Sequence, residues 1–154
     1  MKYNLSKQTE YILGLVCEAK ELATDFKEQV INSSNVSYEL IKPFFNPFME
    51  HHEEFWIILM NKANKPVAFV KVSQGGIDGT VVDNKLIFQQ AVLANASGVI
   101  LVHNHPSGTL RPSEGDIRVT KRFIEAAKIM EINVFDHLIV SYNGYYSFQD
   151  EGIL

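Results

Sequence analysis

Residues 103–116 read HNHPSGTLRPSEGD, and this stretch decides the fold that we expect. It follows an apolar run from Gly98 to Val102 that is typical of a buried strand. Side chains along a strand alternate between its two faces. We therefore expect His103 and His105 to project from one face at the end of this strand, and Asn104 to point the other way.

A turn and a helix follow the two histidines. Pro106-Ser107-Gly108 reverses the chain, and Ser113 opens a helical pattern with Asp116 one turn in. A carboxylate can thus return toward His103 and His105 from a second rigid element. Two imidazole nitrogens and one carboxylate suit zinc, whose catalytic sites take three protein ligands and leave the fourth position for water. The spacing predicts one zinc ion bound by these three side chains.

The start of this helix has a second interpretation. Ser113 and Asp116 fit the spacing of a capping box, in which both side chains bind backbone N–H groups at a helix start. Pairs of histidines also occur at strand ends without metal. The capping interpretation stays open, while the joint spacing of the two histidines and the aspartate favours a metal site.

The rest of the chain alternates between helix and strand patterns. Residues 7–31 carry an apolar stripe of helical period, and Pro43 should stop a second, short helix. This order of elements predicts a mixed α/β domain in which a sheet packs between helices. We expect helices at 36–42, 84–95 and 113–131, strands at 55–60, 67–73, 98–102 and 134–141, a hairpin turn at 61–65, a polar loop at 75–80, and a final strand after a turn at 142–144.

The stretch 103–116 resembles the signature of the JAMM (MPN-plus) metalloproteases, which is His-x-His, seven residues, then Ser-x-x-Asp. Its form HNHPSG resembles the RadC branch of that superfamily. The resemblance implies zinc ligation by His103, His105 and Asp116, and a place for Ser113 beside the bound water and the developing oxyanion. It covers roughly residues 33–154 and continues in LANA at 93–96, VFDHLIV at 134–140, YSF at 146–148 and EG at 151–152.

The resemblance also implies a three-layer fold of the JAMM/MPN type, similar to that of cytidine deaminases. We expect a RadC-like domain at residues 33–154, and residues 1–32 as a helical leader that packs on it. RadC relatives carry a helical module of the DNA-binding type before the metal domain, whereas here a short leader takes that place. DNA binding is therefore not carried over, and we expect the leader to serve core packing or a dimer contact.

Two adjacent glutamates compete for the role of general base, which the resemblance places at the start of an earlier strand. The superfamily pattern of Glu, one residue, then an apolar residue matches Glu53-Glu54-Phe55, with Glu53 as the base. Alternation agrees, because Glu53 and Phe55 would share the inward face while Glu54 faces water. In the competing interpretation both glutamates are solvated charges. We expect His51 and His52 in a surface loop outside the metal site.

A second charged pair lies on a later strand. Asp136 and His137 would point to opposite faces, so both cannot join one site. One of them could orient a zinc-bound histidine, as outer carboxylates often do. We nevertheless favour a structural role for both residues.

Composition and charge limit the classes of protein to which this chain can belong. The chain has 154 residues, 46% of them hydrophobic, which suits one globular domain, and a single cysteine, Cys17, which excludes a disulfide or a cysteine-based zinc site within one chain. Without a signal-peptide pattern or an apolar run near the ~20 residues of a membrane span, we expect a cytoplasmic protein. The net charge of −4 argues against binding to nucleic acid chiefly through phosphates. A local exception is a group of basic residues on or just before the aspartate helix: Arg111, Arg118, Lys121, Arg122 and Lys128.

These observations favour a zinc metallopeptidase or isopeptidase that uses water activated by zinc to cleave an amide bond of a peptide or protein. Glu53 would move the water proton, and Ser113 would donate to the oxyanion. Two alternatives stay open. One is a DNA-repair-associated or nucleic-acid-processing protein, and the other is a non-catalytic binding module of the MPN type. A homodimer is also compatible with the sequence.

Overall fold

The structure is a computed structural model that describes residues 29–45, 49–75 and 82–154. Within these ranges the five strands form one mixed sheet in the order β2-β1-β3-β4-β5. Strands β3 and β4 pair in parallel, and the other neighbours pair antiparallel. The elements are α2 (Ser34–Phe45), β1 (Glu54–Met60), β2 (Pro66–Gln74), α3 (Asn84–Leu93), β3 (Gly98–Asn104), α4 (Glu114–Ile129), β4 (Asn133–Ser141) and β5 (Gly144–Ser147).

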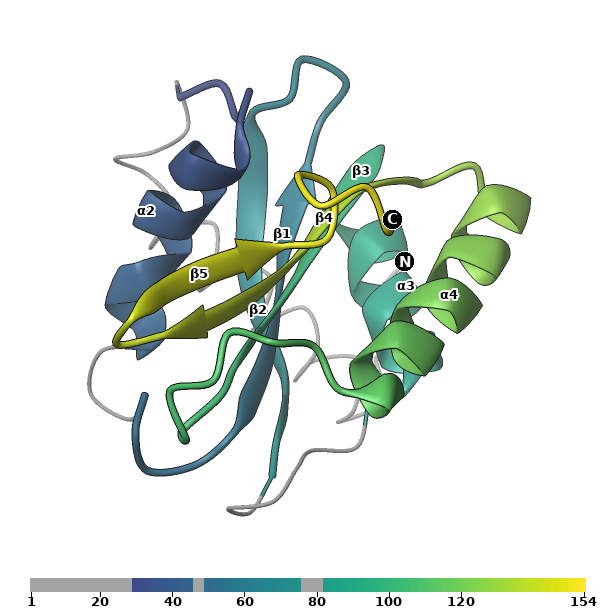
Figure 1. Cartoon of the computed structure of the whole chain (residues 1–154). Coiled ribbons are helices and arrows are strands. Elements are labelled where there is room, and N and C mark those ends of the chain that lie inside the picture. The colour runs from purple at the N-terminus through teal and green to yellow at the C-terminus, as the bar shows by residue number, and fades with distance from the viewer. Residues whose placement is uncertain (1–28, 46–48, 76–81) are drawn as a thin grey trace, which may run out of the picture.

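Helices cover both faces of the sheet, so the predicted α/β class with a mixed sheet between helices is confirmed (Figure 1). Helix α2 lies on one face, and α3 and α4 lie on the other (Figure 1). Most of the predicted leader at 1–32, Cys17 and most of the loop at 75–80 lie outside the described residues. The division into leader and domain therefore stays a prediction.

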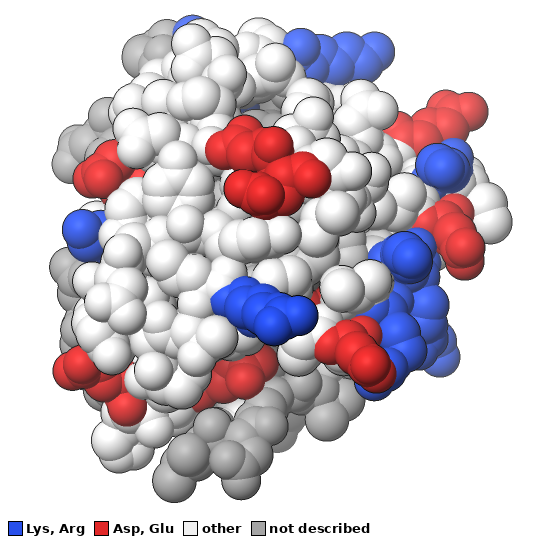
Figure 2. Space-filling model, viewed as in Figure 1, with Lys and Arg blue, Asp and Glu red and all other residues white. Residues whose placement is uncertain are grey.

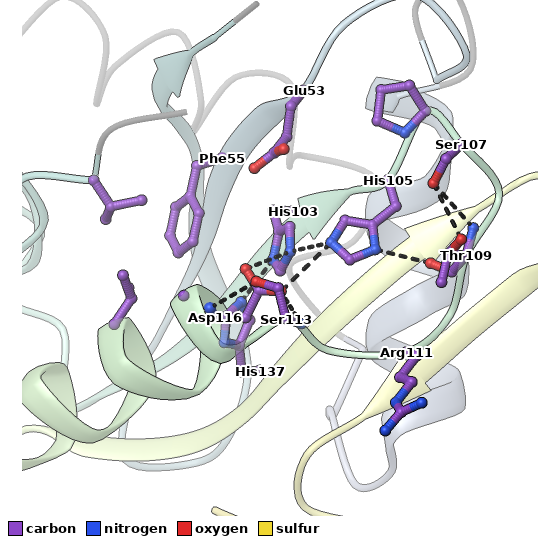
Figure 3. Close-up of a pocket in the computed structure, with 14 residues that line it drawn as sticks. Glu53, Phe55, His103, His105, Ser107, Thr109, Arg111, Ser113, Asp116 and His137 are labelled. Atoms are coloured by element: carbon purple, nitrogen blue, oxygen red, sulfur yellow. Dashed lines mark hydrogen bonds and ion pairs between the residues drawn. The ribbon is translucent and has the colours of Figure 1, made fainter. Parts of the chain in front are cut away.

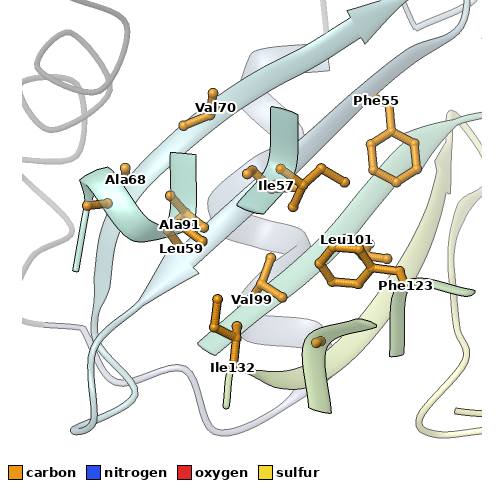
Figure 4. Close-up of a cluster of buried hydrophobic side chains, with 13 residues drawn as sticks. Phe55, Ile57, Leu59, Ala68, Val70, Ala91, Val99, Leu101, Phe123 and Ile132 are labelled. Carbon is orange, nitrogen blue, oxygen red and sulfur yellow. The ribbon is translucent and has the colours of Figure 1, made fainter. Parts of the chain in front are cut away.

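Two hydrophobic clusters fill the space on either side of the sheet. On the α3 and α4 side, Phe123 and Ala91 pack against Phe55, Ile57 and other inward residues of β1 and β3 (Figure 4). The α2 side holds a second cluster, made by Leu40, Ile41 and Phe45 of the helix together with Ile58, Ile100 and Val102 of the strands. Strands β1 and β3 are therefore buried on both faces, as their nearly continuous apolar sequences require.

Helix α2 is longer than the pattern predicts, because it continues through Pro43 to Phe45. A proline inside a helix removes one N–H donor and crowds the preceding turn. Here it lies in the last turn, and the two aromatic residues after it pack on the sheet. Phe44 and Phe45 place their ring centroids 5.3 and 5.9 Å from that of Trp56, and Phe45 is buried. This packing outweighs the cost of the proline.

Candidate metal centre

The two histidines of the HNH stretch lie at the end of β3 on the face covered by α4. His103 stacks on Phe55, with ring centroids 5.9 Å apart and planes at 8°, and it is buried. His105 is half-buried, and its ring centroid lies 4.8 Å from that of His103. Asn104 is buried among backbone groups on the opposite face of β3. The alternation predicted from the sequence is thus confirmed at all three positions.

Asp116 reaches the histidines from the first turn of α4. Its Oδ1 lies 3.3 Å from Nε2 of His103, and its Oδ2 lies 3.6 Å from Nε2 of His105. The same carboxylate accepts from the backbone N–H of Ser113, and the Ser113 hydroxyl accepts from the backbone N–H of Asp116. The capping box and the candidate site therefore coexist, since the cap bond to Oδ2 holds the carboxylate in place while Oδ1 faces His103 (Figure 3).

A tight turn after β3 holds His105. The backbone N–H of His105 donates to Val140 on β4, and the N–H of Gly108 donates back to the carbonyl of His105. Gly108 has φ 81°, a backbone conformation that L side chains rarely adopt, and a Cβ there would also contact the side chain of Tyr142, so this turn favours glycine. The turn brings the carbonyl of Thr109 within 2.8 Å of Nδ1 of His105. Because a carbonyl only accepts, His105 carries its proton on Nδ1 and presents a bare Nε2.

A chain of buried hydrogen bonds fixes the proton of His103 in the same way. The Thr120 hydroxyl donates to the backbone carbonyl of Asp116 at 2.6 Å, so its oxygen accepts from Nδ1 of His137, also at 2.6 Å. Nε2 of His137 is then an acceptor, and it lies 2.8 Å from Nδ1 of His103. His103 therefore holds its proton on Nδ1 and presents a bare Nε2 to Asp116.

Three hydrogen-bond acceptors consequently face one another. Nε2 of His103 lies 3.0 Å from Nε2 of His105, and the ligand atoms of both histidines and Asp116 all lie within 4.8 Å of one another. Lone pairs at these separations repel unless a proton or a metal ion lies between them. Two neutral imidazoles and one carboxylate match a zinc ligand set with an open fourth position. This group of residues could therefore bind a metal ion.

The electrostatics of the site favour a cation. Burial acts to raise the pKa of Asp116. A proton held between its carboxylate and the imidazoles lowers that pKa far below its usual range, because it lets His103 and His105 donate hydrogen bonds and gives His103 a positive charge. Burial acts to lower the pKa of His105, yet Asp116, the Thr109 carbonyl and the charge of Glu53 together raise it. Burial, followed by the charge of His103, lowers the pKa of His137 and keeps it neutral. The carboxylate is thus ionised, and positive charge is stabilised beside it.

Glu53 lies on the wall of the same cleft, directly before β1. The cleft has a volume of about 570 Å³, and its lining includes Glu53, His103, His105, Ser113 and Asp116. Figure 3 shows the Glu53 carboxylate pointing toward the two histidines, across the cleft from Asp116. The structure thus brings together all five side chains that the sequence singled out.

Glu54 does not face water, so that expectation is wrong. Its side chain is buried on the α2 side of β1, where it accepts from Nε1 of Trp56 at 2.8 Å and from Nζ of Lys71 at 3.1 Å. Nε2 of His52 lies 3.0 Å from the same carboxylate. Together these partners lower the pKa of Glu54 against the opposing effect of burial. His52 is accordingly half-buried rather than a surface residue, whereas His51 is exposed as expected.

Sequence reasoning also underrated His137. It favoured a structural role for both members of the pair, which holds for Asp136, whose carboxylate accepts from Ser147 and from two backbone N–H groups. His137 instead contacts a candidate ligand directly. Thr120 and Thr109 were not singled out at all. One signal was present, since Thr120 follows Asp116 by four residues and therefore shares its helix face.

The fold and this site are those of a JAB-type domain with a His-His-Asp group. A model of the RadC-like JAB domain matches residues 31–153, so the chain belongs to that family. A UPF0758 protein of Flavobacterium johnsoniae is 38% identical over 149 residues, which cover 96% of this chain and 64% of that protein. A UPF0758 protein of Porphyromonas gingivalis is 42% identical over 129 residues, 83% of this chain and 56% of that protein. The chain spans less than two-thirds of the length of either relative.

None of the helices in the described ranges has both the length and the apolar character needed to cross a membrane.

Proposed function

We propose that this chain is a zinc-dependent hydrolase that cleaves an amide bond of a peptide or protein, isopeptide bonds included. The supporting observation is that two imidazoles with fixed tautomers and one ionised carboxylate converge opposite Glu53 in an open cleft. A binding module without catalysis would need neither the glutamate across the cleft nor the hydroxyl of Ser113 beside the carboxylate. Membership of the JAB family agrees with this assignment.

The roles follow from where each group lies. A zinc ion bound by the three ligands would polarise the scissile carbonyl and make hydroxide available near neutral pH. Glu53 faces the ligands from the opposite wall, so it can take up the proton of the attacking water and deliver it to the leaving amine. The Ser113 oxygen accepts from the backbone N–H of Asp116, and its hydroxyl also stabilises the Asp116 carboxylate, so its proton would have to turn from that carboxylate to donate to the oxyanion.

The residues that line the cleft suit a polypeptide. The lining of the cleft includes three apolar residues, Phe55, Val82 and Val119. The turn after β3 adds the polar residues Ser107, Thr109 and Arg111, and Figure 3 shows Phe55 on the other side of the histidines from Ser107 and Thr109. An extended peptide offers both apolar side chains and backbone hydrogen-bonding groups to such a groove. We infer that the substrate is bound across the cleft with its scissile bond above the three ligands.

A nucleic-acid substrate is the alternative, and a surface observation favours it. Arg111, Arg118, Lys121 and Arg122 are all exposed, and Figure 2 shows basic side chains gathered at the edge that α4 occupies in Figure 1. Acidic residues interrupt this edge, and a carboxylate oxygen of Glu114 lies 3.3 Å from a guanidinium nitrogen of Arg118. The mixed charge of this surface and the chemistry of the cleft favour an amide substrate over a nucleic acid.

The test compares substrates and variants in one assay. Zinc-reconstituted wild type, Glu53→Gln and His105→Ala are assayed on peptide and isopeptide libraries and on single-stranded, duplex and branched DNA. Glu39→Gln, an exposed glutamate on α2, is the matched control. We expect metal-dependent amide cleavage that falls by ~10²-fold or more in Glu53→Gln while zinc is retained. Metal-dependent cleavage of DNA that is abolished by His105→Ala, with no peptide turned over, would contradict the proposal.

A further inference from the structure

Asn104 lies between the two candidate ligands in sequence, but its side chain is fully buried on the other face of the sheet. Its carboxamide makes three hydrogen bonds to backbone groups. Oδ1 accepts from the N–H of Glu54 at 2.7 Å, and Nδ2 donates to the carbonyls of Met49 at 2.9 Å and His52 at 2.8 Å. Both N–H groups and the oxygen of this amide are therefore in use.

All three partners belong to the segment 49–54, which carries Glu53. The paired register of β1 with β3 ends at Phe55 and His103, so the main chain of β3 no longer pairs with this segment. The Asn104 side chain makes hydrogen bonds to this segment in place of those that strand pairing would make. On the opposite side, the N–H of Gly75 donates to the carbonyl of Glu53 at 2.8 Å. The backbone of Glu53 is thus fixed from both neighbouring strands.

The position of these bonds matters more than their number. The His52 carbonyl and the Glu54 N–H belong to the two peptide groups that flank the Cα atom of Glu53. One side chain therefore fixes the peptide planes on both sides of Glu53. Because Asn104 is bonded through the chain to His103 and His105, a shift of the ligands and a shift of Glu53 are coupled.

Ordinary core packing does not account for an amide at this place. The preceding residues of β3 that face α2, Ile100 and Val102, are apolar and buried in that cluster. Burying an amide is unfavourable unless its hydrogen bonds are made, so an apolar residue would be the default here. The carboxamide is explained by the backbone groups of 49–54 that it satisfies.

We propose that Asn104 is a positioning residue that sets the distance between Glu53 and the metal. This inference rests on the proposed function, in which Glu53 is the general base. A displacement of about 1 Å of a reacting group can lower a rate by ~10²-fold. Losing Asn104 should therefore reduce turnover although Asn104 touches neither metal nor substrate.

The test places Co²⁺ in the site and follows the ¹³C-labelled carboxylate of Glu53 by NMR, assigned through its loss in Glu53→Gln. Paramagnetic broadening falls steeply with distance from the metal. We expect strong broadening in wild type and much weaker broadening in Asn104→Ala, while the imidazole signals of His103 and His105 stay unchanged. Asn61→Ala is the matched control, because the Asn61 side chain accepts backbone N–H groups at the other end of β1.

Turnover provides the second readout. In Asn104→Ala kcat should fall by about a hundredfold with KM and zinc content unchanged, whereas Asn61→Ala should behave as wild type. If Asn104→Ala does not fold, Asn104→Asp keeps the shape and the bond from Glu54 but loses both donors, and the same displacement is expected. Unchanged broadening of Glu53 in whichever variant folds would overturn the proposal.

If the substitution of Asn104 displaces Glu53 but the wild type cleaves no amide, the positioning role stands and the proposed hydrolysis does not. If the wild type cleaves amides and Asn104→Ala cleaves them equally fast with Glu53 in place, the hydrolysis stands and the positioning role is refuted.

Discussion

Replacing His137 by leucine should weaken zinc binding although His137 is not a ligand. His137 is buried, and its Nε2 accepts the proton that His103 carries on Nδ1, at 2.8 Å. Leucine removes this acceptor. In the variant, zinc on Nε2 of His103 keeps the proton on Nδ1 and stops the ring from turning. The buried Nδ1–H of His103 then has lost its acceptor, at a cost of about 1–3 kcal/mol. Without zinc the same ring can change tautomer and escape most of that cost.

The difference between the two states should appear as a weaker affinity for zinc. At ~1.4 kcal/mol per tenfold change, 1–3 kcal/mol corresponds to roughly 5–150-fold, close to the ~10–100-fold typical of residues that orient metal-bound histidines. Competition against a chromophoric chelator measures the change. Thr120→Val should cause a smaller loss, because it removes only the group that fixes the His137 tautomer.

Two further variants make this prediction specific. His137→Gln offers a side-chain oxygen in place of Nε2 and should recover part of the affinity. His51→Ala, at an exposed histidine outside the site, should leave it unchanged. If folded His137→Leu binds zinc as tightly as wild type, with the same absorption spectrum when loaded with Co²⁺, the tautomer chain has no part in metal binding.

The remaining predictions concern three other side chains. Ser113→Ala should lower kcat about a hundredfold and the free energy of unfolding by ~1 kcal/mol through the lost cap, and Ser113→Thr should restore both; equal kcat in all three proteins would remove Ser113 from the mechanism. Glu54→Gln should lower the free energy of unfolding by about 1–3 kcal/mol, measured with denaturant, while kcat stays near that of wild type. Because the pKa of Glu54 is lowered in the fold, this difference in stability should be present above pH ~4.5 and vanish as the pH falls through the folded pKa. Burial raises the pKa of Asp136 above 3.8 despite its hydrogen bonds, so the folded state binds that proton more tightly than the unfolded state does. Wild type should therefore lose stability as the pH rises from about 3.8 through the raised pKa, and Asp136→Asn should be at least as stable as wild type at pH 7. A variant that is less stable than wild type only above that raised pKa would contradict the shift.

Local periodicity predicted most of the site. The period of two placed His103 and His105 on one face and Asn104 on the other, and the helix start placed Asp116 opposite them. These relations depend on neighbours within a few residues. Alternation also put Glu53 and Glu54 on opposite faces correctly.

The errors arose where a prediction depended on distant segments. Alternation cannot tell whether a face meets water, and Glu54 is buried because Trp56, Lys71 and the loop before β1 cover it. His137 approaches His103 only because β3 and β4 pair in parallel, with Leu101 opposite His137. Local patterns predict the crossover helix α4 that parallel pairing requires, but the register of β3 against β4 depends on contacts between segments far apart in the sequence.

In the proposed function, His103, His105 and Asp116 together hold one zinc ion. Elemental analysis tests it most directly, on protein purified without a chelator or a histidine tag, reconstituted with zinc and freed of excess metal. We expect about one equivalent per chain, lost in His103→Ala and in Asp116→Ala and retained in His51→Ala. The same tightly bound equivalent in a variant that lacks all three ligands would contradict it.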